Sequence, residues 1–214
     1  TRSYAQIKDG FDQARARVFF YTRPYYYGSG QTTLLGIETD QAHLPAVLDL
    51  AFDCLRNPTF PAAEFEKLRQ ERLASLEAQQ QDPQALAFNL ATRLGEPYPQ
   101  GHPLATPSFE EEIAAIKALR VEDVRAFYQQ FYGAQDATLA VVGSFDAAAL
   151  RRRVAKQLGG WRARTAYARI PRRTFAGAAQ TQAVQTDDKA NATFIATLQC
   201  PVRDDSPDYA ALYM

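Results

Sequence analysis

The apolar positions in the first forty residues predict a helix followed by a β-hairpin. Ser3 is a suitable N-cap for a helix that ends near Ala14. The segment Arg15–Thr22 then gathers aromatic and β-branched side chains, and Gln31–Thr39 alternates its apolar side chains from one side to the other. A glycine-containing turn at Gly28–Gly30 separates these segments, so we expect them to pair as antiparallel neighbours.

Two long helices follow, each predicted by apolar side chains that recur at helical spacing. Asp40 is placed to cap the first helix, which Asn57 and Pro58 end. The apolar face of this helix consists of Leu44, Val47, Leu48, Ala51 and Leu55. The second helix is highly charged and runs from Pro61 to about Gln80. Its inward-facing positions are expected to be Phe65, Leu68, Leu73 and Leu76.

The rest of the chain alternates shorter helices with irregular segments and two short strands. Helices are expected at Gln84–Leu94, Phe109–Ala118, Val121–Phe131 and Asp146–Leu158, and from Ser206 onward. Prolines between Pro97 and Pro107 predict an irregular loop. The apolar runs Ala137–Val142 and Ala190–Leu198 are typical of buried strands. Together these elements predict an α+β fold, in which helices pack on one face of a mostly antiparallel sheet.

A change of composition predicts how the chain is divided. Between Ala147 and Thr186 there is no acidic residue, whereas nine arginine and lysine residues fall in this stretch. We therefore predict a first unit at residues 1–162, a basic linker at 163–185 and the start of a second unit at 186–214. The sequence begins without a methionine and stops inside a predicted helix, so we expect it to be truncated at both ends and excised from a longer protein.

Composition and charge narrow the possible partners. The 24 basic and 24 acidic residues balance, so no net field draws the chain to nucleic acid or to an anionic membrane. The sequence contains no run of about 18 apolar residues that could cross a bilayer. The two cysteines, Cys54 and Cys200, are too few for a disulfide framework and do not form a CxxC motif. Cys54 falls on an apolar stripe, where we expect it to pack in the core.

Several short motifs follow one another in a particular order. They are Asn57-Pro58-Thr59-Phe60-Pro61, Asp82-Pro83, His102-Pro103 and Ala140-Val141-Val142-Gly143. In order and spacing they resemble one half-unit of the insulinase or pitrilysin-type zinc metallopeptidases, over the stretch from Ser3 to Trp161. The resemblance implies an α+β half-unit of the mitochondrial processing peptidase type. The stretches 186–192 and 203–212 resemble the entry to a second, similar unit.

The resemblance also implies where active members of the family hold zinc. They use the two histidines of a His-x-x-Glu-His motif and a glutamate on a later long helix, and that motif does not occur in this sequence. Counting back from Asp82 places the glutamate position near Ser75. Glu77 is a fallback ligand, but it lies about 200° around the helix from Ser75 and would need a shift of register. The alternative is that Glu71 and Glu77 merely solvate the helix. The resemblance thus implies no catalytic residue, metal ligand or cofactor in this segment.

Other candidate chemistry is weaker. Tyr21, Tyr25 and Tyr26 could line a wall for an extended peptide, although hairpin packing is the simpler interpretation. His43 and His102 have no third ligand spaced for a shared metal site, and His102 is expected to anchor its loop by packing. The arginine-rich stretch invites comparison with nucleic-acid binding. We favour instead a linker that docks on the chain's own acidic surface, such as Glu110–Glu112.

These expectations define one leading functional hypothesis and two alternatives. The leading hypothesis is a non-catalytic domain from the C-terminal half of a zinc metalloendopeptidase. It would help to form the chamber that encloses peptide substrate, while another domain of the parent protein binds zinc and carries out proteolysis. The first alternative is a pseudoenzyme subunit or scaffold that binds a separate active peptidase. The second is that the complete unit is itself active, with Glu77 as ligand. The complementary active half is therefore the expected partner, in the same chain or another, and family analogy suggests the periplasm or an organelle.

Overall fold

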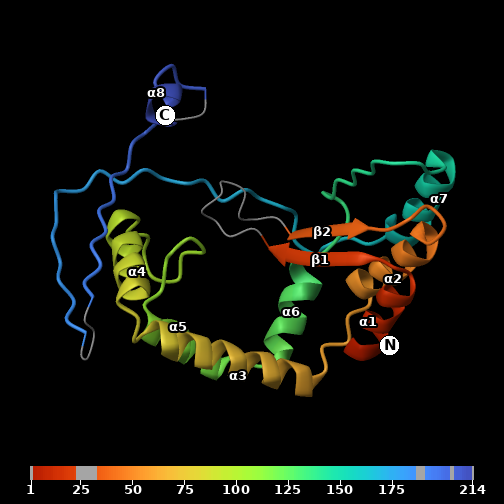
Figure 1. Cartoon of the computed structure of the whole chain (residues 1–214), viewed down its shortest axis with the longest axis horizontal. Helices are drawn as coiled ribbons and strands as arrows, with labels where there is room; N and C mark the ends of the chain where they lie inside the picture. The colour runs from red at the N-terminus through yellow and green to blue at the C-terminus, as the bar shows by residue number, and fades with distance from the viewer. Residues whose placement is uncertain (1, 23–32, 187–190, 203–204, 214) are drawn as a thin grey trace. The chain divides into compact units, whose positions relative to one another are not determined.

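The computed structural model describes residues 2–22, 33–186, 191–202 and 205–213, which form two compact units (Figure 1). The first unit combines Thr1–Ala62 with Arg120–Arg169. The second combines Ala63–Leu119 with Ile170–Met214. These units are each assembled from two stretches of chain. The sequence-based division into residues 1–162, 163–185 and 186–214 stays a prediction.

The first unit begins with the predicted helix and hairpin. Helix α1 (Tyr4–Gln13) starts at a capping box, in which the Ser3 side chain and that of Gln6 each accept a backbone N–H of the other residue. Strands β1 (Arg17–Thr22) and β2 (Thr33–Glu38) pair antiparallel. The predicted turn between them lies outside the described residues.

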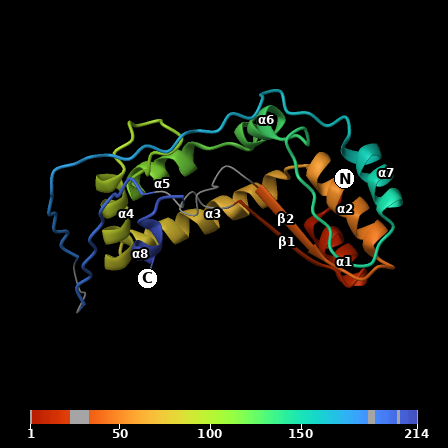
Figure 2. The ribbon, with the colours of Figure 1, turned by 90° about the horizontal axis from the view of Figure 1, so that it is seen from above.

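Helix α2 (Leu44–Arg56) carries the core of the first unit. Its buried side chains are Val47, Leu48, Ala51 and Phe52. Helix α1 packs against both β1 and α2, and α7 (Ala147–Leu158) packs against α2 (Figure 2). A side chain added at Gly10 would approach Leu50 Cδ2 to 2.8 Å, so glycine permits the close approach of α1 to α2. Asn57 follows the last helical residue, as its position before Pro58 predicts.

Helix α6 (Val121–Phe131) contacts the C-terminal end of α2 through aromatic side chains. Tyr128 Oη donates to the carbonyl of Leu55 at 2.5 Å, and its ring meets that of Phe60 edge to face at 5.5 Å. Phe60 has a φ of 46°, a conformation that is uncommon for a residue with a side chain, and Arg125 Nη2 donates to its carbonyl at 3.0 Å. Trp161 stacks on Tyr128 with centroids 6.3 Å apart. The Pro-Thr-Phe motif is therefore held by contacts with α6.

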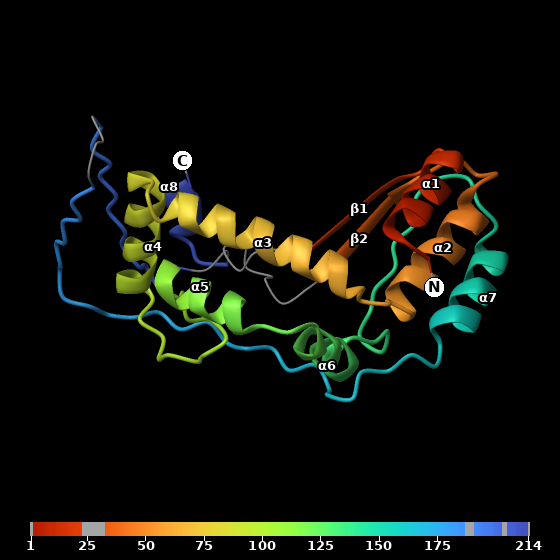
Figure 3. The same ribbon diagram turned by 90° about the horizontal axis from the view of Figure 1, so that it is seen from below.

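The second unit is built on helix α3 (Ala62–Gln79). Helix α5 (Phe109–Ala118) lies alongside it (Figure 3), and Leu73, Leu76 and Phe109 are buried. Asp82 caps α4 (Pro83–Gly95), and Ser108 begins α5 with a capping box like that of α1. A short helix, α8 (Tyr209–Tyr213), occurs where a helix was predicted to begin near Ser206.

The α+β class is confirmed, and the described residues contain a two-stranded antiparallel sheet. Two strand predictions are wrong within the described residues: 137–142 and 191–198 are irregular, and Val142 is 99% and Phe194 88% exposed. A strand needs a neighbour for its backbone groups, and these segments find no ladder partner in the described part of the chain. Leu68, predicted to face inward, is 62% exposed. None of the described helices combines the length and the apolar character needed to span a membrane.

Candidate functional site

Ser75, which the resemblance predicts to stand at the third-ligand position, lies on the exposed side of α3. Ser75 lies between the buried side chains of Leu73 and Leu76 but is itself exposed. Its Oγ accepts a hydrogen bond from Nε2 of Gln79, one turn further along, at 2.9 Å. The serine hydroxyl is therefore engaged with a neutral amide on its own helix.

The nearby carboxylates do not gather around Ser75. Glu77 is exposed, and helical geometry directs it to a different side of α3. Glu71 pairs with Lys67, one turn earlier, at 4.0 Å. Among the described residues there is no group of three or more histidine, cysteine, aspartate or glutamate side chains placed to hold a metal ion. Ser75, Glu71 and Glu77 do not form a zinc donor set, because zinc sites converge three or four nitrogen, sulfur or carboxylate ligands on one point.

The proposed aromatic wall is described at one of its three tyrosines. Tyr21 lies on β1 opposite Leu34, is 40% exposed and stacks on Phe19 with centroids 6.1 Å apart. The Phe19 ring also covers Gly36 on the neighbouring strand, where an added Cβ would come within 1.9 Å of it. Tyr25 and Tyr26 lie outside the described residues. The described part of the hairpin thus shows the cross-strand packing that was the simpler interpretation, with an aromatic surface still exposed.

The histidines have local partners within their own units. His43 Nδ1 lies 2.7 Å from Oδ1 of Asp40, and this hydrogen bond is the main reason why the pKa of the Asp40 carboxyl is lowered. His102 stacks on Tyr98 with centroids 4.6 Å apart, and its Nδ1 accepts the backbone N–H of Leu104 at 3.1 Å. His102 is therefore the packed loop anchor that the sequence predicted.

The acidic surface of α5 is engaged by α3. Arg72 of α3 pairs with Glu112, and Nε2 of Gln80 donates to Glu110 at 2.6 Å. Hydrogen bonds from the backbone at the start of α5 come first among the causes that lower the pKa of Glu110. Arg172, on the basic segment, pairs at 2.9 Å with Glu96, which directly follows α4. The basic segment therefore does contact an acidic residue of this chain, as predicted. The contact is with Glu96, however, and not with the predicted Glu110–Glu112.

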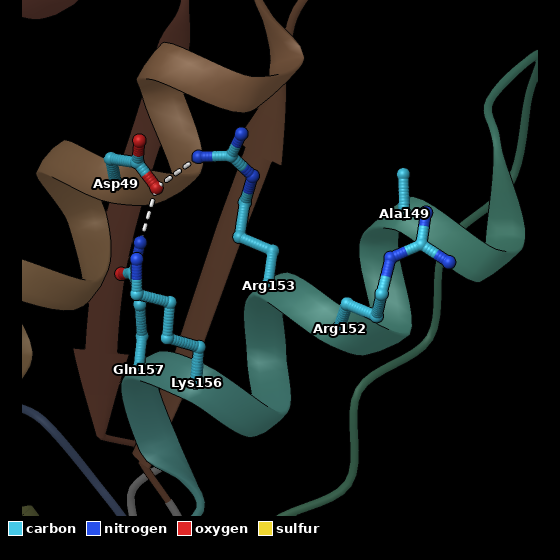
Figure 4. Close-up of a pocket in the computed structure, with 6 residues that line it drawn as sticks. All are labelled: Asp49, Ala149, Arg152, Arg153, Lys156 and Gln157. Carbon is cyan, nitrogen blue, oxygen red and sulfur yellow. Dashed lines mark hydrogen bonds and ion pairs between the residues drawn. The ribbon is translucent and has the colours of Figure 1, made fainter.

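The described structure also has a shallow groove between α2 and α7, of about 360 Å³ (Figure 4). It is lined by Asp49, Ala149, Arg152, Arg153, Lys156 and Gln157. The Asp49 carboxylate accepts hydrogen bonds from both Arg153 and Gln157. Sequence analysis grouped these arginines with the linker and did not single out the groove. The signal it contained was the spacing of Arg152 and Lys156, four residues apart on one helix.

Cys54 and Tyr128, which lie near the C-terminal end of α2, have pKa values that are shifted mainly by burial. Burial raises the pKa of the Cys54 thiol, consistent with the predicted packing role, and it raises the pKa of the Tyr128 hydroxyl. Cys200 is exposed. A raised pKa keeps the Cys54 thiol protonated, and the Tyr128 hydroxyl donates to backbone carbonyls. Among the described residues, neither group has the partner base that activates a nucleophile, so their geometry does not indicate covalent chemistry.

The chain is similar to one protein-family model and to a solved structure. Residues 118–214 match the family model described as the peptidase M16 inactive domain. A crystal structure of the peptidase M16 inactive domain from Pseudomonas fluorescens is similar with a TM-score of 0.62 at 22% sequence identity. The similarity covers 79% of this chain and 39% of that chain, so this chain spans about two-fifths of the solved one. The search of curated proteins returned no match.

These findings confirm the resemblance to the metallopeptidase family that the motifs predicted. The family model concerns the inactive kind of domain, and it supports a non-catalytic, peptidase-like domain in this chain. At 22% identity the solved structure shows the fold alone.

Proposed function

We propose that this domain helps to form the chamber of a zinc metalloendopeptidase in which another domain carries out proteolysis. The observation that carries the proposal is the match to the peptidase M16 inactive domain over residues 118–214. Ser75 is a further argument. We take it as the position that corresponds to the family's glutamate ligand, and its hydroxyl is hydrogen-bonded to Gln79.

In such an arrangement the domain contributes confinement rather than bond cleavage. An enclosing wall excludes bulk water and large folded proteins, and it holds an extended peptide near the catalytic groups of the opposite half. Zinc would be bound in that opposite half, by the histidine pair and glutamate that the family uses. We assign part of the wall to Tyr21, Tyr25 and Tyr26, because aromatic side chains can pack against an extended chain of varied sequence.

Zinc content and peptide hydrolysis of the purified chain provide the first test. We expect neither bound zinc by elemental analysis nor cleavage of a quenched fluorescent peptide. Stoichiometric zinc that is lost in Glu77→Gln but retained in the matched variant Glu71→Gln would overturn the proposal and make this unit the active one.

The parent protein provides a test of the wall. Tyr21→Ala should raise KM for a peptide substrate and leave kcat nearly unchanged, because the side chain would act in binding alone. Tyr167→Ala, at another exposed tyrosine, is the matched control and should change neither constant. If the parent gene encodes no unit with His-x-x-Glu-His, the active peptidase is a separate partner. In that case this chain is a pseudoenzyme subunit, and co-elution with that partner would show it.

A further inference from the structure

The groove between α2 and α7 is lined by two cations, Arg152 and Lys156, that form no ion pair with the described residues, although the charge of Arg152 acts at longer range on Asp146. The Asp49 carboxylate pairs with Arg153, so these two charges compensate each other. Arg152 and Lys156 also line the groove, and no described carboxylate lies within ion-pair distance of either. Figure 4 shows Arg152 directed away from the Asp49 contacts. The groove is therefore locally cationic, although the whole chain has a formal net charge of zero.

The wall of this groove is fixed by hydrogen bonds. Arg153 Nη1 donates to the carbonyl of Pro45 at 3.3 Å as well as to Asp49. Gln157 donates to the same carboxylate, and its own carbonyl accepts a hydrogen bond from Arg56. These contacts bind α7 to α2 and hold one side of the groove in place. Arg152 and Lys156 take no part in that network, so they are not needed for it.

The spacing of the two free cations defines what could bind them. Residues four apart on a helix lie one above the other, separated by about 6 Å along the axis. In an extended chain, every second side chain points to the same face, and such neighbours are separated by about 6.6 Å. Two carboxylates at alternate positions of an extended segment therefore match Arg152 and Lys156 in register. Like charges at this helical spacing repel each other, so a bound anion pair would also relieve that repulsion.

We propose that Arg152 and Lys156 form a docking site for an extended acidic segment of a partner protein, with acidic residues at alternate positions. Charge complementarity is the argument for this occupant. Single-stranded nucleic acid is less suited, because the lining has no aromatic side chain on which bases could stack. A membrane surface is less suited, because the only apolar lining residue is Ala149. The proposal does not depend on the part that this domain takes in proteolysis.

Binding of defined peptides to the purified chain tests this assignment. The probe is a dye-labelled peptide of alternating glutamate and serine, measured by fluorescence anisotropy at low ionic strength, where surface charges are least screened. We expect the double variant Arg152→Gln/Lys156→Gln to weaken binding about tenfold, because both charge-assisted contacts are lost. A peptide of the same composition with its glutamates consecutive should bind more weakly, since neighbouring side chains then point to opposite faces.

The matched control is Arg151→Gln/Arg169→Gln, which removes the same net charge from residues that do not line the groove. It should change the affinity by less than about twofold if binding is local. Circular dichroism and thermal unfolding confirm that each variant is folded. Equal losses in both double variants, or no binding of the acidic peptide to the unchanged chain, would overturn the proposal. Tighter binding of single-stranded DNA or of anionic vesicles than of the peptide would also overturn it and assign the charges to that partner.

Discussion

The two units of this molecule bury their apolar side chains in different ways. In the described part of the first unit, every buried hydrophobic residue comes from α2, which lies against α1 and α7. In the second unit, Leu73 and Leu76 of α3 are buried together with Phe109 of α5. The buried residues of the first unit thus come from one helix, α2, whereas those of the second unit come from two helices, α3 and α5.

The seam between α3 and α5 carries polar contacts, as the surroundings of α2 also do. Arg72 pairs with Glu112, Gln80 bonds to Glu110, and Arg69 Nη1 donates to the carbonyl of Lys117 at 3.3 Å. Exposed pairs of this kind contribute little to stability. The comparison therefore teaches that a few apolar side chains decide the stability of each unit, and that the polar contacts set how the helices are aligned.

The largest effect should come from Phe52→Ala in the first unit. Phe52 is 5% exposed, and removal of a buried phenylalanine ring leaves a cavity that costs about 3–5 kcal/mol. Denaturant unfolding should show this loss, and hydrogen exchange should speed up in α2. The control is Phe20→Ala on β1, where the ring is 53% exposed, and its cost should be much smaller. Equal effects would mean that α2 does not carry the core of its unit.

Leu76→Ala makes the corresponding change in the second unit. Its side chain is fully buried at 0% exposure, so we expect a loss of about 2–5 kcal/mol and faster exchange in both α3 and α5. Leu68→Ala on the same helix should cost less than about 0.5 kcal/mol, because Leu68 is exposed and alanine favours helices. If Leu68→Ala were as damaging, the inward position predicted from the apolar spacing would be right after all.

How much the sequence could predict depends on how local each feature is. The caps at Ser3, Asp82, Ser108 and Asp146 involve residues at most three positions away, and the structure has all four, whereas the N-cap of α2 is His43 and not the predicted Asp40. Leu68 was assigned by spacing alone, and spacing does not say which neighbour covers a face. The segment 137–142 was assigned by composition, but a strand also needs a partner distant in the sequence.

The candidate site shows the same limit. The assignment of Ser75 stays a prediction, and it needs only a count back from Asp82, at the start of α4, into α3. The groove could not be predicted, because Asp49 and Arg153 are 104 residues apart in the sequence. Only the packing of α7 on α2 brings them together, and it also places Arg152 and Lys156 along the groove.

The capping boxes that begin with serine, on α1 in the first unit and α5 in the second, allow a smaller test. Ser108→Ala should destabilise α5 by about 1 kcal/mol, because the backbone N–H of Glu111 loses its acceptor, the Ser108 hydroxyl. Ser3→Ala on α1 should cost somewhat less, since Ser108 is paired with the charged Glu111 and Ser3 with the neutral Gln6. Thermal unfolding checks both variants, and Ser108→Thr should restore most of the loss. A larger cost at Ser3 would reverse this ranking.

The smallest effect concerns the pH dependence of α7, which carries the basic groove. Asp146 Oδ1 accepts the backbone N–H groups of Ala148 and Ala149 at 2.8 and 3.0 Å, and the latter contact is the main cause of its lowered pKa. A carboxyl whose pKa is lowered in the folded state stabilises the helix at a pH above its ordinary pKa of about 3.9. It loses that contribution as pH falls through the lowered folded-state pKa.

Asp146→Asn keeps a capping side chain but removes the charge. Between neutral pH and about pH 5, the difference in unfolding free energy between the chain and this variant should be constant, and it should shrink as the solution is made more acidic. A difference that stays constant through that acidic range would show that the charge of Asp146 does not stabilise the start of α7, and the hydrogen bonds of its side chain alone would then account for the cap.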